Sequence, residues 1–297
     1  MHKAVLLDET INGLDLKPNN VVFDGTLGAG GHSEEIFKRF GSKIKIIATD
    51  RDSEAINRAT TKICKDGCDF QAFLSDYRKI DSVLEKVGVK NVNGIILDLG
   101  LSSDQLDLSG RGFTFKNNEP LLMTFSNTAG EDQITAKMIL NSWGEETLAD
   151  IFYGYSDEKY SRRIARKIIE AREKKPIEMT DELVAIIKSA VPVSYEKGKI
   201  HFATKTFQAI RMAVNDEVEA LKEGLRKSID LLAPSGRIAI ISFHSTEDRI
   251  VKDTFREWKE KGLGKPINKK PITASENELR ENPRSRSAKL RIFKKND

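Results

Sequence analysis

The amino-acid sequence predicts an α/β protein in which a parallel sheet, covered by helices on both faces, is interrupted by an all-helical segment. Two observations support this prediction. In roughly the first hundred residues, short apolar runs alternate with helix-like runs, and several of the apolar runs end in an aspartate. Such alternation favours a parallel sheet whose strands are buried on both faces. From position 110 to about 203, by contrast, the chain is charged and contains no strand-like run.

The alternating part contains four expected strands with helices between them. The strands are expected at 21–24, 43–50, 70–74 and 93–100, and the helices at 33–40, 52–65 and 80–87. The pattern resumes after the charged segment with a strand at 236–245, a helix at 246–259 and an edge strand at 289–293. The predicted domains are 1–108 and 206–297, which together build the sheet, and 109–205, a helical insertion expected to recognise the substrate.

The charged segment carries several signals of helix ends. S-W-G-E has the pattern of a capping box, in which Ser142 would cap a helix that starts near Glu145. A further helix is expected over 157–172 because apolar residues recur there at helical spacing. Thr180 is expected to be the N-cap of the helix that follows. The segment is therefore predicted to contain helices only.

A long apolar stripe follows this segment. Its members recur at steps of three and four: Phe207, Ile210, Val214, Val218, Leu221, Leu225, Ile229 and Leu232. This period places all of them on one side of a helix. One long helix is therefore expected over 204–232, and the P-S-G sequence at 234–236 is expected to end it.

The composition indicates a soluble globular protein. No apolar run is long enough to span a bilayer, and the N-terminus lacks the pattern of a signal peptide. We therefore expect a cytoplasmic protein that does not bind membranes. Cys64 and Cys68 have neither a second cysteine pair nor nearby histidines, so reduced thiols are expected and no metal site is predicted. The oligomeric state, monomer or homodimer, stays open.

The positive charge is concentrated near the C-terminus. Positions 259–297 contain twelve Lys and Arg against five Asp and Glu, a net charge of +7, whereas the whole chain carries +4, which leaves −3 for positions 1–258. A basic terminal segment is either a solvated tail or a contact surface for a polyanion. The charge alone does not decide between them.

The glycine-rich stretch from Val21 to Gly31 predicts a site for a nucleotide-like cofactor. Its strand, glycine turn and helix start are the usual cradle for such ligands, although the glycines alone could form an ordinary loop. A dinucleotide motif would need a third glycine at position 33, which is Ser33. The D-x-x-x-G-x-G spacing that begins at Asp24 instead favours S-adenosylmethionine (AdoMet) over NAD(P).

Two further residues fit this cofactor. Asp50 ends the second expected strand, where a carboxylate usually contacts ribose hydroxyls. Tyr77 follows the third expected strand and offers an aromatic face to the adenine.

Blocks along the whole chain closely resemble the bacterial RsmH (MraW) methyltransferases. They include D-G-T-L-G-A-G-G-H-S, G-I-I-L-D-L-G-L-S-S-D-Q-L, R-G-F-T-F, A-T-K-T-F-Q-A-I-R-M-A-V-N-D-E, I-S-F-H-S-T-E-D-R-I-V-K and N-P-R-S-R-S-A-K-L-R. The resemblance implies a Rossmann-like AdoMet-dependent methyltransferase sheet with an inserted all-helical substrate domain. It also implies N4-methylation of a cytidine in the decoding region of 16S rRNA, with small-subunit ribosomal RNA or the 30S particle as the partner.

The resemblance assigns several residues to the site. The cofactor-binding residues that it implies are Gly30, Gly31, His32, Asp50, Tyr77, Asp98 and Gln105. The cytosine amine needs a hydrogen-bond acceptor, and we expect it in the turn after Asp98, from a main-chain carbonyl, from Asp98 or from Ser102. The candidate contacts to the RNA are Arg111, His244, Arg284 and Arg286, although His244 could equally be a core histidine.

Some positions depart from the family's pattern. The family has P-L-D-M-R-M-D where this chain reads P-L-L-M-T-F-S at Pro120–Ser126, so that two carboxylates and an arginine are missing. Thr246, Lys205 and the Y-S-D-E sequence ending at Glu158 also differ. An AdoMet-binding relative that binds RNA or the ribosome with altered or lost activity is therefore an alternative. An NAD(P)-dependent reductase is another.

Overall fold

The protein forms two compact units. The structure is a computed structural model that describes residues 4–63, 69–127 and 133–297. One unit, the sheet unit, comprises Met1–Gly100 and Val218–Asp297, and the other, the helical unit, comprises Leu101–Glu217. The helical unit is longer at both ends than the predicted insertion, and its role in substrate recognition stays a prediction. Cys64 and Cys68 lie outside the described residues.

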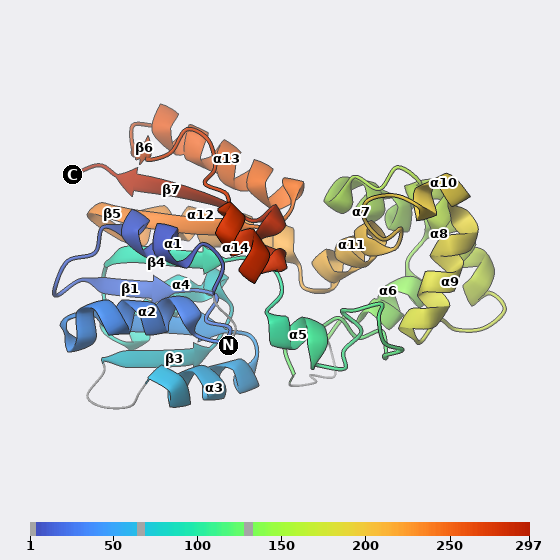
Figure 1. Cartoon of the computed structure of the whole chain (residues 1–297), viewed down its shortest axis with the longest axis horizontal. Coiled ribbons are helices and arrows are strands. Elements are labelled where there is room, and N and C mark those ends of the chain that lie inside the picture. The colour runs from blue at the N-terminus through green and yellow to red at the C-terminus, as the bar shows by residue number, and fades with distance from the viewer. Residues whose placement is uncertain (1–3, 64–68, 128–132) are drawn as a thin grey trace. The chain divides into compact units, whose positions relative to one another are not determined.

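The sheet unit contains a seven-stranded sheet in the order β3-β2-β1-β4-β5-β7-β6 (Figure 1). The strands are β1 Val21–Asp24, β2 Lys45–Asp50, β3 Phe70–Leu74, β4 Val92–Asp98, β5 Leu232–Ser242, β6 Gly264–Pro266 and β7 Lys289–Lys295. Strands β1 to β5 pair in parallel, and β7 is antiparallel to β5 and β6. The predicted α/β class with a parallel, Rossmann-like sheet is confirmed.

Helices cover both faces of this sheet. They are α1 Leu7–Leu14, α2 Gly31–Phe40, α3 Ser53–Ile63, α4 Ile80–Lys86, α12 Glu217–Leu231, α13 Ser245–Glu260 and α14 Glu276–Glu281. Successive side chains of a strand point to opposite faces. In β1, Val22 accordingly packs in the core that includes residues of α1 and α2, and Phe23 packs in the core of α4, α12 and α13. Because β1 to β5 are parallel, their carboxyl ends lie along one edge of the sheet.

The helical unit has a hydrophobic core of its own. Its helices are α5 Ser103–Asp107, α6 Ala136–Ser142, α7 Glu145–Ser156, α8 Ser161–Arg172, α9 Thr180–Ala190, α10 Val193–Glu196 and α11 Thr204–Val214. Phe152, Ile164 and Ile187 are fully buried in this core. Within the described part of this unit the chain forms no strand, only a bridge between Pro120 and Met179.

The long helix expected over 204–232 is wrong, because the chain breaks into α11 and α12. Asp216 has a left-handed backbone with φ of 52°, which a continuous helix excludes. The apolar stripe continues through the break, but its two parts pack in different hydrophobic cores. Ile210 packs in the helical unit, whereas Leu225 packs beneath the sheet. Periodicity alone therefore predicted most of the helical residues but not the break. The expected helix end is also wrong, because Leu232 and the P-S-G sequence lie in β5.

Two expected helix starts are also corrected. Ser142 does not cap α7: it ends α6, and its hydroxyl donates to the carbonyl of Met138. Gly144 precedes α7 without a side-chain cap. Thr180 is the first residue of α9 rather than its N-cap, and its hydroxyl donates to the Asn117 carbonyl. The helix expected over 157–172 begins only at Ser161.

The basic C-terminal segment is folded into the sheet. Strand β7 lies between β5 and β6, so the expected edge strand is an inner strand, and the short β6 forms the edge. Some of the positive charge is neutralised locally. Arg291 and Lys289 pair with Asp248, and the Lys295 ammonium donates to main-chain carbonyls at the end of α12. The segment is therefore not a solvated tail.

In the parts of the chain that the structure describes, none of the helices combines the length and the apolar composition that a membrane span requires.

Substitution of Phe293 tests the structural role of the basic segment. Phe293 is fully buried in β7 and packs against the rings of Phe255 and Trp258. Phe293→Ala is expected to lower the free energy of unfolding by about 3–5 kcal/mol in urea denaturation, because it leaves a cavity. Lys269→Ala, at an exposed position of the same segment, should change it by less than about 0.5 kcal/mol. Equal small effects of both substitutions would indicate a solvated tail.

Candidate active site

Three neighbouring strands end in an aspartate at the same edge of the sheet. Strands β2, β1 and β4 lie side by side and end at Asp50, Asp24 and Asp98. In parallel α/β sheets, ligands bind at the carboxyl ends of the strands. The sequence reasoning expected Asp98 beside the glycine turn, and the structure places it there, because the Asp98 amide donates to the hydroxyl of Thr26 at 2.6 Å.

The glycine turn is held by Asp50. The Gly28 amide donates to Asp50 Oδ2 at 2.7 Å, and the Asp52 amide donates to Oδ1 at 2.9 Å. Gly30 has φ of 73°, a left-handed backbone that disfavours other residues. A Cβ on Gly30 would lie 2.9 Å from Cβ of Ala59. The packing of the sheet unit itself therefore requires Gly30, beyond any approach to a ligand.

The N-terminal segment likewise leaves no room for a side chain at Gly31. A Cβ at this position would lie 2.8 Å from Cβ of Ala4. Tyr77, in a 3-10 turn at Tyr77–Lys79 after β3, also depends on glycines. A Cβ on Gly224 of α12 would approach the Tyr77 ring to 2.7 Å, and one on Gly25 would approach Cβ of Tyr77 to 2.8 Å. One side of the aromatic residue expected at the adenine thus packs on α12.

Asp24 is a buried carboxylate with two donors. The hydroxyl of Ser33 donates to Oδ2 at 2.6 Å, and the Thr26 amide donates to Oδ1 at 3.2 Å. Burial nevertheless raises the pKa of Asp24 to about 6, and the neighbouring Asp50 contributes to the increase. Ser33 is the residue that breaks the dinucleotide motif, and its hydroxyl has a defined role here. A glycine at this position would leave Asp24 without this hydroxyl donor.

Asp98 lacks such donors. Its side chain is 25% exposed, but its Oδ1 atom is buried and has no hydrogen-bond partner among the described residues. Burial raises the pKa of Asp98 to about 8, and the negative charges of Asp24 and Glu247 add to the effect. A buried oxygen without a donor is costly. It is therefore the atom at this edge that most needs a partner.

His32 lies next to Asp98 and is neutral. Its side chain is buried, which lowers its pKa to about 4. Nε2 lies 3.2 Å from the Val5 carbonyl, and a neutral ring can make this bond only if Nε2 carries the proton. Nδ1 is then a lone-pair acceptor, 3.8 Å from Asp98 Oδ2. His32 therefore orients its unprotonated nitrogen toward Asp98 without adding a positive charge.

The charge of this edge fits AdoMet. Among the described residues, none of the carboxylates of Asp24, Asp50 and Asp98 pairs with a lysine or an arginine. Buried carboxylates without a cation are unfavourable in the ionised state. AdoMet carries a sulfonium and an ammonium group, and its ribose hydroxyls are donors. It would supply both the positive charge and the hydrogen bonds that this edge lacks.

Ser102 and Gln105 belong to the helical unit and form a capping box at the start of α5. The Gln105 amide donates to the Ser102 hydroxyl, and the Ser102 amide donates to Gln105 Oε1, each at 3.1 Å. This is the reciprocal S-x-x-Q arrangement. The S-x-x-Q spacing is visible in the sequence and gives both residues a structural role at the start of α5. Their roles in catalysis and cofactor binding stay predictions.

Arg111 is buried within the helical unit rather than exposed to a phosphate. Its Nη1 donates to the carbonyls of Thr124 and Phe125 at 2.9 and 2.7 Å. Asn215 makes a second clamp on this stretch: Oδ1 accepts from the Phe125 amide at 2.8 Å, and Nδ2 donates to the Met123 carbonyl at 2.7 Å. The observed contacts give Arg111 a structural role.

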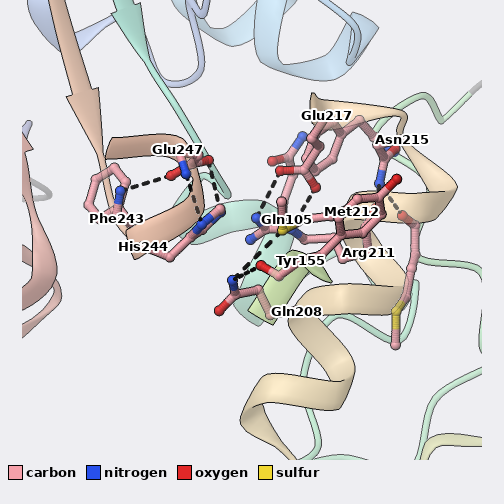
Figure 2. A network of polar contacts seen from close by, with 12 residues as sticks. Gln105, Tyr155, Gln208, Arg211, Met212, Asn215, Glu217, Phe243, His244 and Glu247 are labelled. Atoms are coloured by element: carbon pink, nitrogen blue, oxygen red, sulfur yellow. Dashed lines mark hydrogen bonds and ion pairs between the residues drawn. The ribbon is translucent and has the colours of Figure 1, made fainter. Parts of the chain in front are cut away.

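These two clamps bear on the divergent stretch Pro120–Ser126. Both act on main-chain atoms, so they do not depend on the side chains that differ from the family's pattern. Asn215, which sequence reasoning missed, also marks the break between α11 and α12. Its neighbour on α11, Arg211, makes a bidentate pair with Glu217 at 2.7 and 2.8 Å (Figure 2).

His244 caps helix α13 in the sheet unit. Its Nδ1 accepts from the Glu247 amide at 3.4 Å, and Nε2 lies 3.1 Å from Glu247 Oε1 (Figure 2). Glu247 Oε2 in turn accepts from the Phe243 amide at 2.9 Å. Nε2 nevertheless has no hydrogen-bond partner among the described residues, so His244 is a helix cap but not a fully satisfied core histidine, and its contact with RNA stays a prediction. Of the other two candidate RNA contacts, both in the 3-10 turn Pro283–Ser287, Arg286 is exposed and Arg284 is half-buried.

Comparisons with known proteins agree with this picture. A family model described as the MraW methylase family matches residues 1–296. The curated "Ribosomal RNA small subunit methyltransferase H 2" of Agathobacter rectalis is 42% identical over 312 residues, which cover 100% of this chain and 98% of the relative.

The solved structures are more distant. An rRNA methylase from Streptococcus thermophilus has a TM-score of 0.45 and 11% identity, covering 100% of this chain and 99% of its own. NSun6 from Pyrococcus horikoshii has the same TM-score and identity, covering 99% of this chain and 53% of its own. At this similarity the two solved structures say nothing about function.

The raised pKa of Asp98 predicts a pH dependence of stability in the absence of cofactor. The folded state keeps a proton on Asp98 up to a pH of about 8, while the unfolded chain loses it near 3.8. Stability should therefore fall as the pH rises through this window, by up to about 1.4 kcal/mol per pH unit for one proton. Between pH 6 and 8 Asp98 is the main cause, because the pKa of Asp24 is about 6.

Asp98→Asn should flatten this fall, measured as the free energy of unfolding in urea at a series of pH values. Asp150→Asn, at an exposed position on α7, is the control and should leave the slope unchanged. A wild-type slope that Asp98→Asn does not alter would contradict the assignment.

Proposed function

The chain belongs to the MraW methylase family, and we propose that it methylates N4 of one cytidine in the decoding region of 16S rRNA, equivalent to cytidine 1402. The observation that carries the proposal is the unpaired carboxylate edge at Asp24, Asp50 and Asp98, which suits a sulfonium cofactor, in a chain that matches this family over its whole length. Its substrate would be small-subunit ribosomal RNA or the 30S particle.

Alignment is the main catalytic task in such a reaction. When bound, AdoMet supplies the methyl group, which forms a bond to the nitrogen as its bond to sulfur breaks. The residues of this chain hold the reactants in line, and correct alignment can lower the barrier by roughly 7–11 kcal/mol. We propose that Asp50 holds the ribose and that Gly30, Gly31 and His32 hold the amino-acid part, with Tyr77 and Gln105 completing the cofactor site.

The remaining task is to accept the proton of the amine. The lone pair of the cytosine amine is delocalised into the ring, and an acceptor at the N–H would localise it. Asp98 Oδ1 is buried and has no donor in the described structure, so it is available as an acceptor once a nearby cation has lowered the pKa of this carboxyl. The Ser102 hydroxyl already serves as the cap of α5. These contacts favour Asp98 over the Ser102 side chain as the acceptor of the amine proton. A main-chain carbonyl of the turn is the remaining alternative.

The alternative of lost activity rests on Pro120–Ser126. Arg111 and Asn215 bind main-chain carbonyls and an amide of this stretch rather than its altered side chains. We therefore expect its main-chain conformation to be the same as in relatives with the usual sequence. The missing charges would then alter contacts to the RNA rather than the structure of the unit. The active enzyme and the inactive relative differ in one observable, the transfer of a methyl group from AdoMet to the rRNA.

A direct experiment distinguishes them. Purified protein is incubated with 30S particles from a strain that lacks this methyl group, with AdoMet labelled at the methyl carbon. The rRNA is then digested and analysed by mass spectrometry. The expected product is one N4-methylcytidine at the decoding-region position. AdoMet binding without any methyl transfer would support the inactive relative, and methylation of another base or position would contradict the proposed specificity.

Two substitutions test the proposed acceptor. In single turnovers at saturating AdoMet, Asp98→Asn is expected to lower the rate by about 10²–10⁴, the usual contribution of a proton acceptor. Ser102→Ala should lower stability by about 0.5–2 kcal/mol through loss of the cap and should change the rate by less than about tenfold. The opposite pattern, a large loss with Ser102→Ala and a small one with Asp98→Asn, would assign the acceptor to Ser102.

A further inference from the structure

We propose that the rRNA is held on the helical unit by a basic surface at the start of α8. This α8 basic surface consists of Lys159, Arg162, Arg163 and Arg166, with the rings of Tyr160 and Tyr195. Its ligand would be the phosphate backbone of the substrate rRNA. The inference rests on the proposed function, and it adds where on this unit the polyanion binds.

The cations of this surface are exposed and lack acidic partners. Lys159, Arg162 and Arg163 are all exposed. Across the described residues, none of the three forms an ion pair with a carboxylate. Arg166 is 69% exposed and has a long contact of 3.5 Å with Glu145. The surface therefore carries positive charge that the protein itself does not neutralise.

Other lysines on the same unit behave differently. Each of the following has a glutamate partner: Lys137 with Glu178, Lys167 with Glu170, Lys175 with Glu182 and Lys188 with Glu196. At these four positions, acidic and basic side chains alternate on the surface and neutralise one another. The α8 basic surface departs from that arrangement.

The stability of α8 does not explain these charges. Arg162 and Arg163 lie in the first turn of the helix, which contains no acidic residue. The N-terminal end of a helix carries a partial positive charge, so each cation there is electrostatically unfavourable, most of all at low salt. An anion bound at this surface would remove that repulsion. The arrangement therefore favours a negatively charged partner.

Two tyrosines hold the cations in place. The rings of Tyr160 and Tyr195 pack edge to face with centroids 4.9 Å apart. The Lys159 ammonium lies 5.1 Å from one ring centroid and 5.0 Å from the other, and the Arg163 guanidinium lies 5.7 Å from Tyr160. These are cation–π distances. The contacts restrict the side chains before a ligand binds, which reduces the entropy lost on binding.

A buried carboxylate anchors the tyrosines. Glu158 is fully buried. Its Oε1 accepts from the Tyr160 amide at 2.9 Å, and its Oε2 accepts from the Tyr195 hydroxyl at 2.8 Å. The hydroxyl of Tyr195 is thereby turned toward the protein interior. Glu158 thus positions both rings, and through them Lys159 and Arg163.

The chemistry of this surface fits RNA. Arginine and lysine contacts to phosphates supply most of the affinity in nucleic-acid binding. Aromatic rings among the cations are typical of surfaces that bind unpaired strands. A target base that must be reached by the enzyme is expected to be unstacked, and phosphate contacts elsewhere on the same RNA would help to hold the substrate on the enzyme.

The test measures how salt affects RNA binding by the full-length chain. The probe is an rRNA fragment of the decoding region with a fluorescent label, followed by anisotropy at several salt concentrations. Arg162→Ala with Arg163→Ala is expected to weaken binding by roughly tenfold and to lower the slope of log Kd against log salt by about 1.4, that is, about 0.7 for each lost phosphate contact. The Kd for AdoMet should not change.

A matched control removes two charges from the same unit. Lys175→Ala with Lys188→Ala, both paired with glutamates, should leave the salt slope unchanged. Thermal unfolding checks the fold, and the arginine variant should be at least as stable as the wild type because the helix dipole no longer opposes the two charges. An arginine variant with the wild-type slope, or a control with an equal loss, would overturn the proposal.

The ring contribution has its own test. Tyr160→Phe keeps the ring and should bind the fragment as the wild type does, whereas Tyr160→Leu should weaken binding several-fold because Lys159 and Arg163 lose their orientation. Equal binding by both would refute the role of the ring. Vesicles of anionic lipid serve as a second probe. Vesicle binding that the arginine substitutions abolish, with RNA binding intact, would overturn the assignment to RNA.

Methylation separates failure of this inference from failure of the proposed function. If the wild type methylates 30S particles and the arginine variant does so with the same KM and kcat, the surface assignment is wrong and the function stands. If the wild type itself transfers no methyl group, the function fails. The expected result is a raised KM for the particles with kcat little changed.

Discussion

Three carboxyl groups that pair with no lysine or arginine in the described parts of the chain determine what the sheet unit can bind. Asp24, Asp50 and Asp98 end adjacent strands, and the surrounding main chain and hydroxyls satisfy them unequally. Asp50 receives two amides and Asp24 a hydroxyl and an amide, whereas the buried oxygen of Asp98 receives none. The ionised form of these carboxyl groups is consequently unfavourable in the free protein, and a bound cation would stabilise it. Cofactor affinity and the pH response of the free protein have this common origin.

His32, the neighbour of Asp98, does not supply the missing positive charge. A protonated histidine next to Asp98 would favour the ionised form of this carboxyl and compete with a cationic ligand. Burial and the Val5 carbonyl instead keep His32 neutral, with its proton on the far nitrogen. The N-terminal segment that presents Val5 is held by the bond from the Leu6 amide to Glu278 of α14. The first and last parts of the chain therefore both contribute to the environment of Asp98.

The sheet could be predicted from sequence because its rules are local. Apolar runs ending in aspartate predict strands and their carboxyl ends, and the D-x-x-x-G-x-G spacing predicts the turn beside them. The break at Asn215 and Asp216 could not be predicted in this way, since the apolar period continues through it and only the two separate cores reveal it.

Arg111 and His244 show a second limit of sequence reasoning. Their residue type suits RNA, whereas their structural roles depend on partners distant in sequence or on a helix end. Sequence located Asp98 well, but it could not show which of its oxygens lacks a donor.

The order of the strands constrains how the protein folds during synthesis. Strand β4 has β5 as its neighbour, and more than a hundred residues of the helical unit are made between the two. Until Leu232–Ser242 have left the ribosome, one edge of β4 exposes unpaired amides and carbonyls. The helical unit, whose core is formed by its own residues, can become compact earlier. The nascent chain therefore passes through a stage in which an apolar strand edge is open to aggregation or chaperone binding.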